Sequence, residues 1–292
     1  VILFIPIMTV SGAYTVNSSE MVGGLGIQSE HIAFISFVTS IGMAAFSPFF
    51  YALVSVRRQK MMSLVGFSLL AVQSYICANT DSLFILALNS LVMGFVRQTL
   101  LMCNLFTLIK YGFGIEATRN VTPGNEPMDE KGWDALDTEK KASQPIIYFF
   151  FMLLGQIGTW ITAWFAYNYH WQMVYYAMLG AILVALLITL VCMPYNPYPT
   201  KHSPLSFSKF GNVVVFCLMC CSFVYVTVYG KVYDWYDSPN IRWATVICVV
   251  SSLLFFYLEK TRRSPYFMLK AFKSRSIQGG ILLFIGLMIC NS

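Results

Sequence analysis

Two apolar runs near the end of the chain decide the fold: NVVVFCLMCCSFVYVTVYG at residues 212–230 and ATVICVVSSLLFFYL at residues 244–258. Between them lies the polar, aromatic segment KVYDWYDSPNIRW, residues 231–243. Each run approaches the length of about 20 residues that an α-helix needs to cross a bilayer core. A helix also satisfies its own backbone hydrogen bonds there, so the pattern predicts two membrane-spanning helices joined by a hairpin.

The whole chain shares this composition. It is 57% hydrophobic and 11% charged, with a mean hydropathy of +0.65, whereas soluble domains carry about 25% charged residues. The sequence therefore predicts an all-α polytopic membrane protein. The expected spans are Val1–Val22, Ile32–Val54, Met61–Ala78, Leu83–Ile109, Ile146–Tyr167, Met173–Met193, Gly211–Tyr229 and Ala244–Leu258, with an incomplete ninth from Ile277. Both ends of the chain lie in or near apolar runs, so we expect it to be a piece of a longer protein.

The basic residues set the orientation. All but three of the 19 Lys and Arg residues lie in loops that alternating crossings place on one side, at residues 57–60, 110–141, 201–209 and 260–275. The positive-inside rule assigns that side to the cytoplasm. The net charge of +6 is then explained by topology, and no nucleic-acid partner is expected.

The segment 231–243 becomes an external hairpin under this topology. Its rings at Tyr233, Trp235, Tyr236 and Trp243 suit the headgroup region, where an amphipathic ring has one apolar and one wet side. Pro239 is expected to turn the chain between two antiparallel helices.

Two motifs in this part of the chain resemble a known family. Residues 230–241, GKVYDWYDSPNI, are similar to the G…DWF-x-SP-x-I hairpin of the fourteen-helix drug/proton antiporters of the major facilitator superfamily. Residues 264–277, SPYFMLKAFKSRSI, resemble that family's P-x-x-d-L-x-l-F-k-x-R-x-F segment, which leads into the second half of those transporters.

Weaker resemblances run through the first half. PFFYALVSVRRQK at residues 48–60 is similar to the P-x-x-G-x-L-x-D-R-x-G-R-K loop, and GAYTVN at residues 12–17 resembles D-x-T-I-V-N, with Gly12 at the acidic position. Gly155 and Gly158 resemble a G-P-x-x-G-G-W-I motif without its proline, and Arg97 matches the arginine of an R-x-x-q-G motif. The expected cytoplasmic loop motif consists of Leu53, Arg57, Arg58 and Lys60.

The resemblance implies three parts. Residues 1–194 would form a six-helix bundle of inverted repeats, residues 195–258 two linker helices, and residues 259–292 a cytoplasmic loop and the start of a second bundle. It further implies proton-coupled efflux of amphipathic organic compounds or drugs by alternating access. The expected partners are the lipid bilayer, a small-molecule substrate, protons and a missing C-terminal half, in a bacterial inner membrane.

Polar side chains within the spans are the candidate substrate or coupling residues. Ser11, Tyr14 or Thr15, and Ser18 recur at helical spacing and place hydroxyls on one face of the first span. The same role is considered for Asn17, Gln156 and Arg97. Each has a structural alternative: small polar residues often hold membrane helices together, glycines permit close packing, and an arginine can clamp helix-end carbonyls.

Two function classes remain at this point. The first is a secondary transporter, and the second is a membrane protein with a non-transport role, such as a membrane-embedded enzyme or assembly subunit. The eight cysteines lie in apolar segments without a second ligand pair at metal-site spacing, and the sequence has no P-loop motif. The sequence therefore predicts no cofactor, no metal and no enzymatic activity, and it favours an ion gradient as the energy source.

Overall fold

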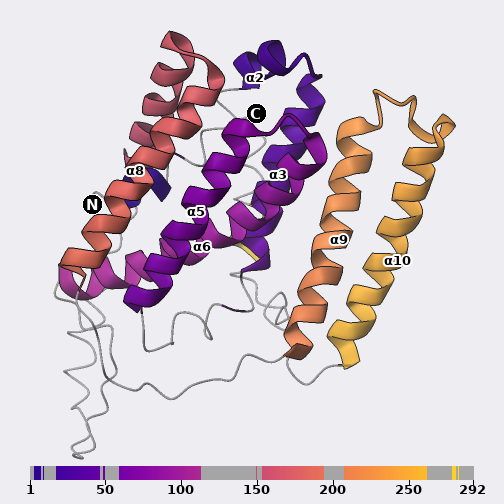
Figure 1. The fold of residues 1–292 in the computed structure, drawn as a ribbon. Helices are drawn as coiled ribbons and strands as arrows, with labels where there is room; N and C mark the ends of the chain where they lie inside the picture. Colours follow the sequence, from indigo (N-terminus) through magenta and orange to yellow (C-terminus); the bar gives the residue numbers. More distant parts are fainter. Residues whose placement is uncertain are drawn as a thin grey trace, which may run out of the picture.

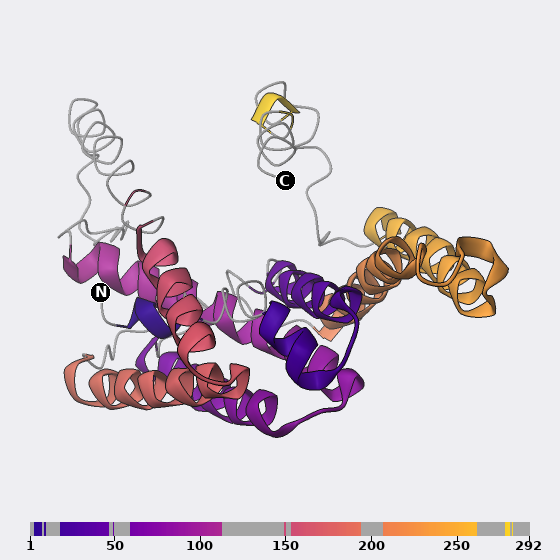
Figure 2. The same ribbon diagram turned by 90° about the horizontal axis from the view of Figure 1, so that it is seen from above.

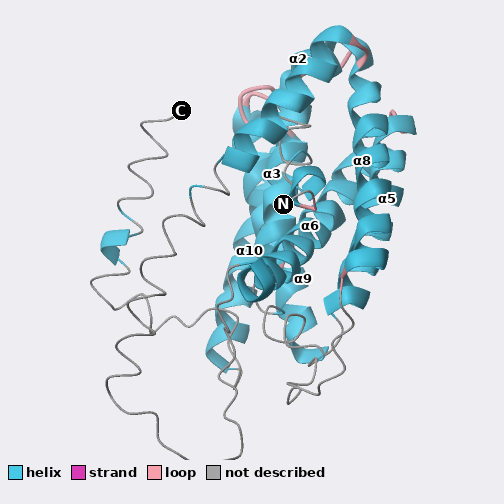
Figure 3. Ribbon diagram, turned by 90° about the vertical axis from the view of Figure 1, so that its left-hand side faces the viewer, coloured by secondary structure: helices cyan, strands magenta, loops and turns pink. Residues whose placement is uncertain are grey.

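The computed structural model describes residues 3–7, 9, 18–46, 49, 59–112, 149, 153–193, 207–261, 278–280 and 282. This part of the chain is helical and contains no strand (Figure 3). Its helices are α2 (Ser18–Leu25), α3 (Ser29–Ala45), α5 (Gln59–Asn79), α6 (Leu83–Gly112), α8 (Trp171–Cys192), α9 (Phe207–Tyr229) and α10 (Pro239–Thr261), with a short 3-10 helix η2 (Trp235–Asp237). Residues 153–168 are also helical.

Five helices of the described residues are long and apolar enough to cross a membrane. They are Lys60–Asn79, Leu83–Leu105, Trp171–Cys192, Phe210–Tyr229 and Pro239–Thr261. Helix α3 is a shorter apolar helix. The predicted fold class is confirmed: the chain is an all-α polytopic membrane protein.

The helices pack side by side. Helix α6 lies against α3 and α5, α8 packs on α5, and α9 and α10 form an antiparallel pair that meets the rest of the molecule where α9 contacts α3 (Figure 1). Seen from above, the α9–α10 pair stands at one side of the other helices (Figure 2). The main apolar core lies among α2, α3, α5, α6 and α8.

Several helix ends agree with the sequence prediction, and one differs clearly. Helix α6 begins at Leu83 and α9 ends at Tyr229, as expected. Helix α3, however, ends at Ala45 with Phe46 as its C-cap, well before the predicted end at Val54. Pro48 follows closely, and proline cannot donate the backbone hydrogen bond that would continue a helix.

The hairpin between α9 and α10 is also built differently from the prediction. Pro239 does not make the turn but is the first residue of α10, where its missing N–H costs nothing. Asp234 and Trp235 make the turn with left-handed φ angles of 50° and 53°. The Trp235 ring packs so closely on Gly230 that a Cβ there would lie 2.7 Å from the ring. These contacts explain why glycine and tryptophan are paired in this segment.

Candidate functional site

Arg97 lies on the inward face of α6, among the other helices. Its side chain is 7% exposed. Its Nε donates a hydrogen bond to the carbonyl oxygen of Ile7 at 3.0 Å, and its Nη1 lies 3.3 Å from the Met43 sulfur on α3. Arginine near the middle of a span costs about 2.5–3.5 kcal/mol on insertion scales. The position is therefore unusual enough to mark a candidate site.

Arg97 has no ion pair among the described residues. Among the described residues, its contacts are a neutral carbonyl and a weakly accepting thioether, and neither carries a negative charge. The described carboxylates lie near helix ends or in turns, at Glu20, Glu30, Asp81, Asp234, Asp237 and Glu259. The geometry suits the binding of an additional anionic or strongly accepting group.

A pair of glycines places α6 against α3 beside this arginine. A Cβ at Gly94 would overlap the carbonyl oxygen of Thr39, and a Cβ at Gly42 would overlap that of Leu91. The two backbones are thus in direct contact, with one glycine contributed by each helix. Because Gly94 precedes Arg97 by about one helical turn, this contact fixes the depth at which the guanidinium meets Met43. Neither glycine was predicted from the sequence to make such a contact.

Amide and hydroxyl side chains join α5, α6 and α8 in the same bundle. Asn89 on α6 donates to the Gln73 carbonyl at 3.0 Å and to the Cys77 sulfur at 3.1 Å on α5. Ser74 on α5 donates to the Tyr175 carbonyl of α8 at 2.9 Å. The side-chain oxygen Oε1 of Gln73 is buried and has no hydrogen-bond partner among the described residues. These contacts hold the helices together, as the structural alternative expects for polar residues in spans.

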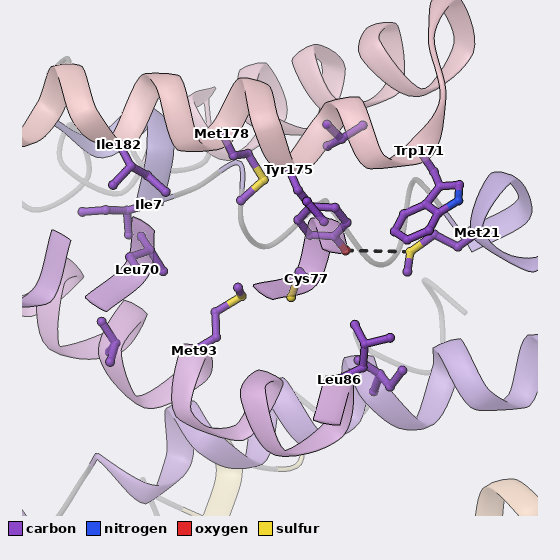
Figure 4. Close-up of a cluster of buried hydrophobic side chains, with 14 of the residues drawn as sticks. Ile7, Met21, Leu70, Cys77, Leu86, Met93, Trp171, Tyr175, Met178 and Ile182 are labelled. Carbon is purple, nitrogen blue, oxygen red and sulfur yellow. Dashed lines mark hydrogen bonds between the residues drawn. The ribbon is translucent and has the colours of Figure 1, made fainter. Parts of the chain in front are cut away.

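Next to these hydrogen-bonded amide and hydroxyl side chains, sulfur-containing and aromatic side chains fill the core. Figure 4 shows Tyr175 between Trp171 and Met178 of α8, with Cys77 and Met93 below it. The Tyr175 hydroxyl points to the Met21 sulfur of α2, at 3.8 Å (Figure 4). Methionine adapts its shape to irregular gaps, which suits a core that joins several helices. Within the described residues, no group of three His, Cys, Asp or Glu side chains is arranged to hold a metal ion.

The structure describes half of the predicted site residues. Six lie outside the described residues: Ser11, Tyr14, Asn17, Leu53, Arg57 and Arg58. Ser18 begins α2 and is half-buried, and Gln156 is exposed on the helix at 153–168. Among the predicted substrate or coupling residues that the structure describes, Arg97 is the one that is buried.

The close helix contact expected at Gly155 is absent from the described part of the chain. A Cβ at Gly155 would meet no atom within 4 Å. Gly158 is buried, and its carbonyl accepts a hydrogen bond from the Thr162 hydroxyl of the same helix at 3.1 Å. A direct backbone contact of this kind lies between Gly42 of α3 and Gly94 of α6.

Lys60, predicted as part of a cytoplasmic loop motif, lies in the first turn of α5. Its Nζ donates to the Leu190 carbonyl at 2.7 Å, in the last turn of α8. A cation there interacts favourably with the exposed carbonyls and the negative end of the helix dipole. Lys60 therefore joins the ends of two neighbouring helices.

The chain is similar to a known protein over part of its length. No protein-family model matches it. It is 24% identical over 140 residues to the colistin resistance protein EmrB of Acinetobacter baumannii. The alignment covers 47% of this chain and 27% of that protein, so the chain matches about a quarter of its relative. The apolar helices and this partial similarity fit an integral membrane protein.

Proposed function

We propose that this chain is the first bundle and linker hairpin of a proton-coupled exporter of amphipathic organic compounds, of the fourteen-helix antiporter branch of the major facilitator superfamily. The name of its relative, a colistin resistance protein, supports export of a noxious amphipathic compound. The hairpin and the segment at residues 264–277, which resemble that branch, support the assignment. The bacterial inner membrane is the proposed location.

Buried Arg97 carries the mechanistic part of the proposal. A fixed positive charge in a low-dielectric interior favours the ionised form of a nearby carboxylate and attracts an anionic substrate group. The first bundle leaves this charge without an ionic partner among its described residues. The second wall of a midplane cavity, contributed by the other half, would then supply the carboxylate or present the substrate. Arg97 would bind this partner in one state of the alternating-access cycle and release it in the other.

The test replaces Arg97 in the full-length protein. We expect Arg97→Ala and Arg97→Lys both to abolish proton-driven uptake of a fluorescent amphipathic cation by inverted membrane vesicles. The lysine variant should fail because a compact ammonium cannot reproduce the planar donor fork. Arg242→Ala is the matched control, since Arg242 lies exposed in the first turn of α10 and its side chain bonds, among the described residues, the nearby Asp237 carbonyl. It should transport like the wild type.

The outcomes separate function from structure. Wild-type transport by either Arg97 variant would discard the proposed coupling role. Loss of inserted, folded protein in both variants would assign Arg97 to a structural clamp on the Ile7 carbonyl. No transport by the wild-type full-length protein, with any of a panel of amphipathic cations and anions, would favour the non-transport class.

A further inference from the structure

The linker hairpin, defined here as α9, η2 and α10, rests on the first bundle through α9. Helix α9 packs along α3, whereas the principal neighbours of α10 are α9 and η2 (Figures 1 and 2). The described contacts between hairpin and bundle include one set near Tyr229, at the outer end of α9, and another around Val213 and Phe216, towards its inner end. Both sets oppose movement of the hairpin relative to the bundle.

The outer contact is polar and aromatic. His31, in the first turn of α3, shares a hydrogen bond between its Nδ1 and the Tyr229 hydroxyl at 2.5 Å, across 198 residues of sequence. Phe34, about one turn further along α3, packs edge-on against Tyr225 with ring centroids 5.9 Å apart. Its ring also lies 5.7 Å from that of Tyr229, which in turn stacks on Tyr233 at 5.8 Å. The end of α9 is thus held by both ring packing and a hydrogen bond.

The inner contact is apolar. Val213 and Phe216 of α9 cluster with Ala45, the last residue of α3, and with Phe49. Phe255 of α10 joins the same cluster and packs against Phe216 with ring centroids 5.8 Å apart. Helix α10 is therefore tied to this cluster through Phe216 of α9.

The two contacts are widely separated along α9. From Val213 to Tyr229 a helix rises about 24 Å at 1.5 Å per residue. A rod held at two points that far apart can neither tilt nor slide without breaking one of them. Packed cores and interfaces are bistable rather than continuously deformable, so small tilts are not accommodated gradually.

We propose that the linker hairpin is a fixed part of the first bundle and moves with it as one rigid body. This inference rests on the proposed function, because it concerns the motion of alternating access. It places the sliding surfaces of that motion between the first bundle and the second half, not between α3 and α9. The hairpin would then act as a spacer that leaves the α3–α9 interface unchanged through the transport cycle.

The experiment locks the interface in the full-length protein, in a background without native cysteines. His31→Cys is combined with Tyr229→Cys, and the two thiols are joined by a short bifunctional maleimide. A reagent is used because the two side chains meet at their tips, and their backbones are too far apart for a disulfide. Phe34→Cys with Tyr225→Cys is the second pair, and the single-cysteine variants are the controls. Joining is read on gels after proteolysis between the two positions.

We expect both pairs to be joined in high yield and transport to stay at the level of the same variant before crosslinking. Loss of transport on joining either pair, with the single-cysteine controls still active after reagent, would overturn the inference. Failure of both pairs to join would overturn the contact on which it rests. Absence of transport from the parent protein before any crosslinking would sink the proposed function itself, which separates the two failures.

Discussion

Gly94→Ala tests whether the direct backbone contact between α3 and α6 holds the bundle together. The added methyl would overlap the Thr39 carbonyl oxygen and would lie 3.0 Å from the Met43 nitrogen. Both are backbone atoms of a packed helix, which cannot move aside as a side chain can. Overpacking of this kind typically costs about 1–3 kcal/mol.

A matched glycine isolates this packing cost from the effect of alanine on helix formation. Alanine is favoured over glycine in a helix interior by about 1 kcal/mol, and this gain offsets part of the loss at Gly94. A methyl group added at Gly180, in the middle of α8, would meet no atom within 4 Å. Gly180→Ala should therefore show the helical gain alone, and the two variants should differ by about 1–3 kcal/mol.

The free energy of unfolding is measured on purified full-length protein in mixed micelles, by titration with a denaturing detergent and circular dichroism. We expect Gly94→Ala to unfold at clearly lower denaturant than Gly180→Ala, with Gly42→Ala resembling Gly94→Ala because its methyl would overlap the Leu91 carbonyl. Equal stability of Gly94→Ala and Gly180→Ala would refute the close contact. The placement of Arg97 beside Met43 would then lose its physical basis.

Two further predictions concern the membrane topology and the transport activity of residues 1–292 alone. In a background without native thiols, an impermeant thiol reagent outside the cell should label Ser238→Cys but not Ser264→Cys, since the basic loops place residue 264 in the cytoplasm. Equal labelling of both would overturn the span assignment. Residues 1–292 alone, reconstituted in vesicles, should transport nothing, because a midplane site between two halves needs both walls; saturable, gradient-dependent transport by this piece would contradict the proposal.

The sequence predicted the helical class and many helix ends because these depend on local properties. Length and hydropathy locate a span wherever it packs, which is why the start of α6 at Leu83 and the end of α9 at Tyr229 agree with the structure. The early end of α3 was missed although Pro48 signals it, since hydropathy continues past the proline. Pro239 was assigned to a turn because proline is common in turns. Proline is equally suited to the first turn of a helix, and sequence alone does not separate the two uses.

The contacts of the candidate site could not be predicted because they depend on which helices become neighbours. Gly42, Gly94 and Gly155 each lie within an apolar run, and nothing in the sequence distinguishes them. In the structure, the first two face another helix backbone and the third faces open space. His31 and Tyr229 are 198 residues apart, and nothing local pairs them. Arg97 is the exception, because a charge within an apolar run signals its own importance before its partners are known.

The setting of Arg97 and the docking of the hairpin lead to one view of the mechanism. Helix α3 contacts α6 through Gly42 and α9 through His31. The same helix therefore provides the Met43 sulfur that contacts Arg97 and the surface on which the linker hairpin packs. A displacement of the second half would then act on α3, α6 and the hairpin as one body. Under the proposed function, the change that such a body would transmit to its interior is electrostatic: a carboxylate or anionic substrate would reach the guanidinium in one state and withdraw in the other. The buried charge, costly when unpaired, is therefore the element whose partner we expect to change during transport.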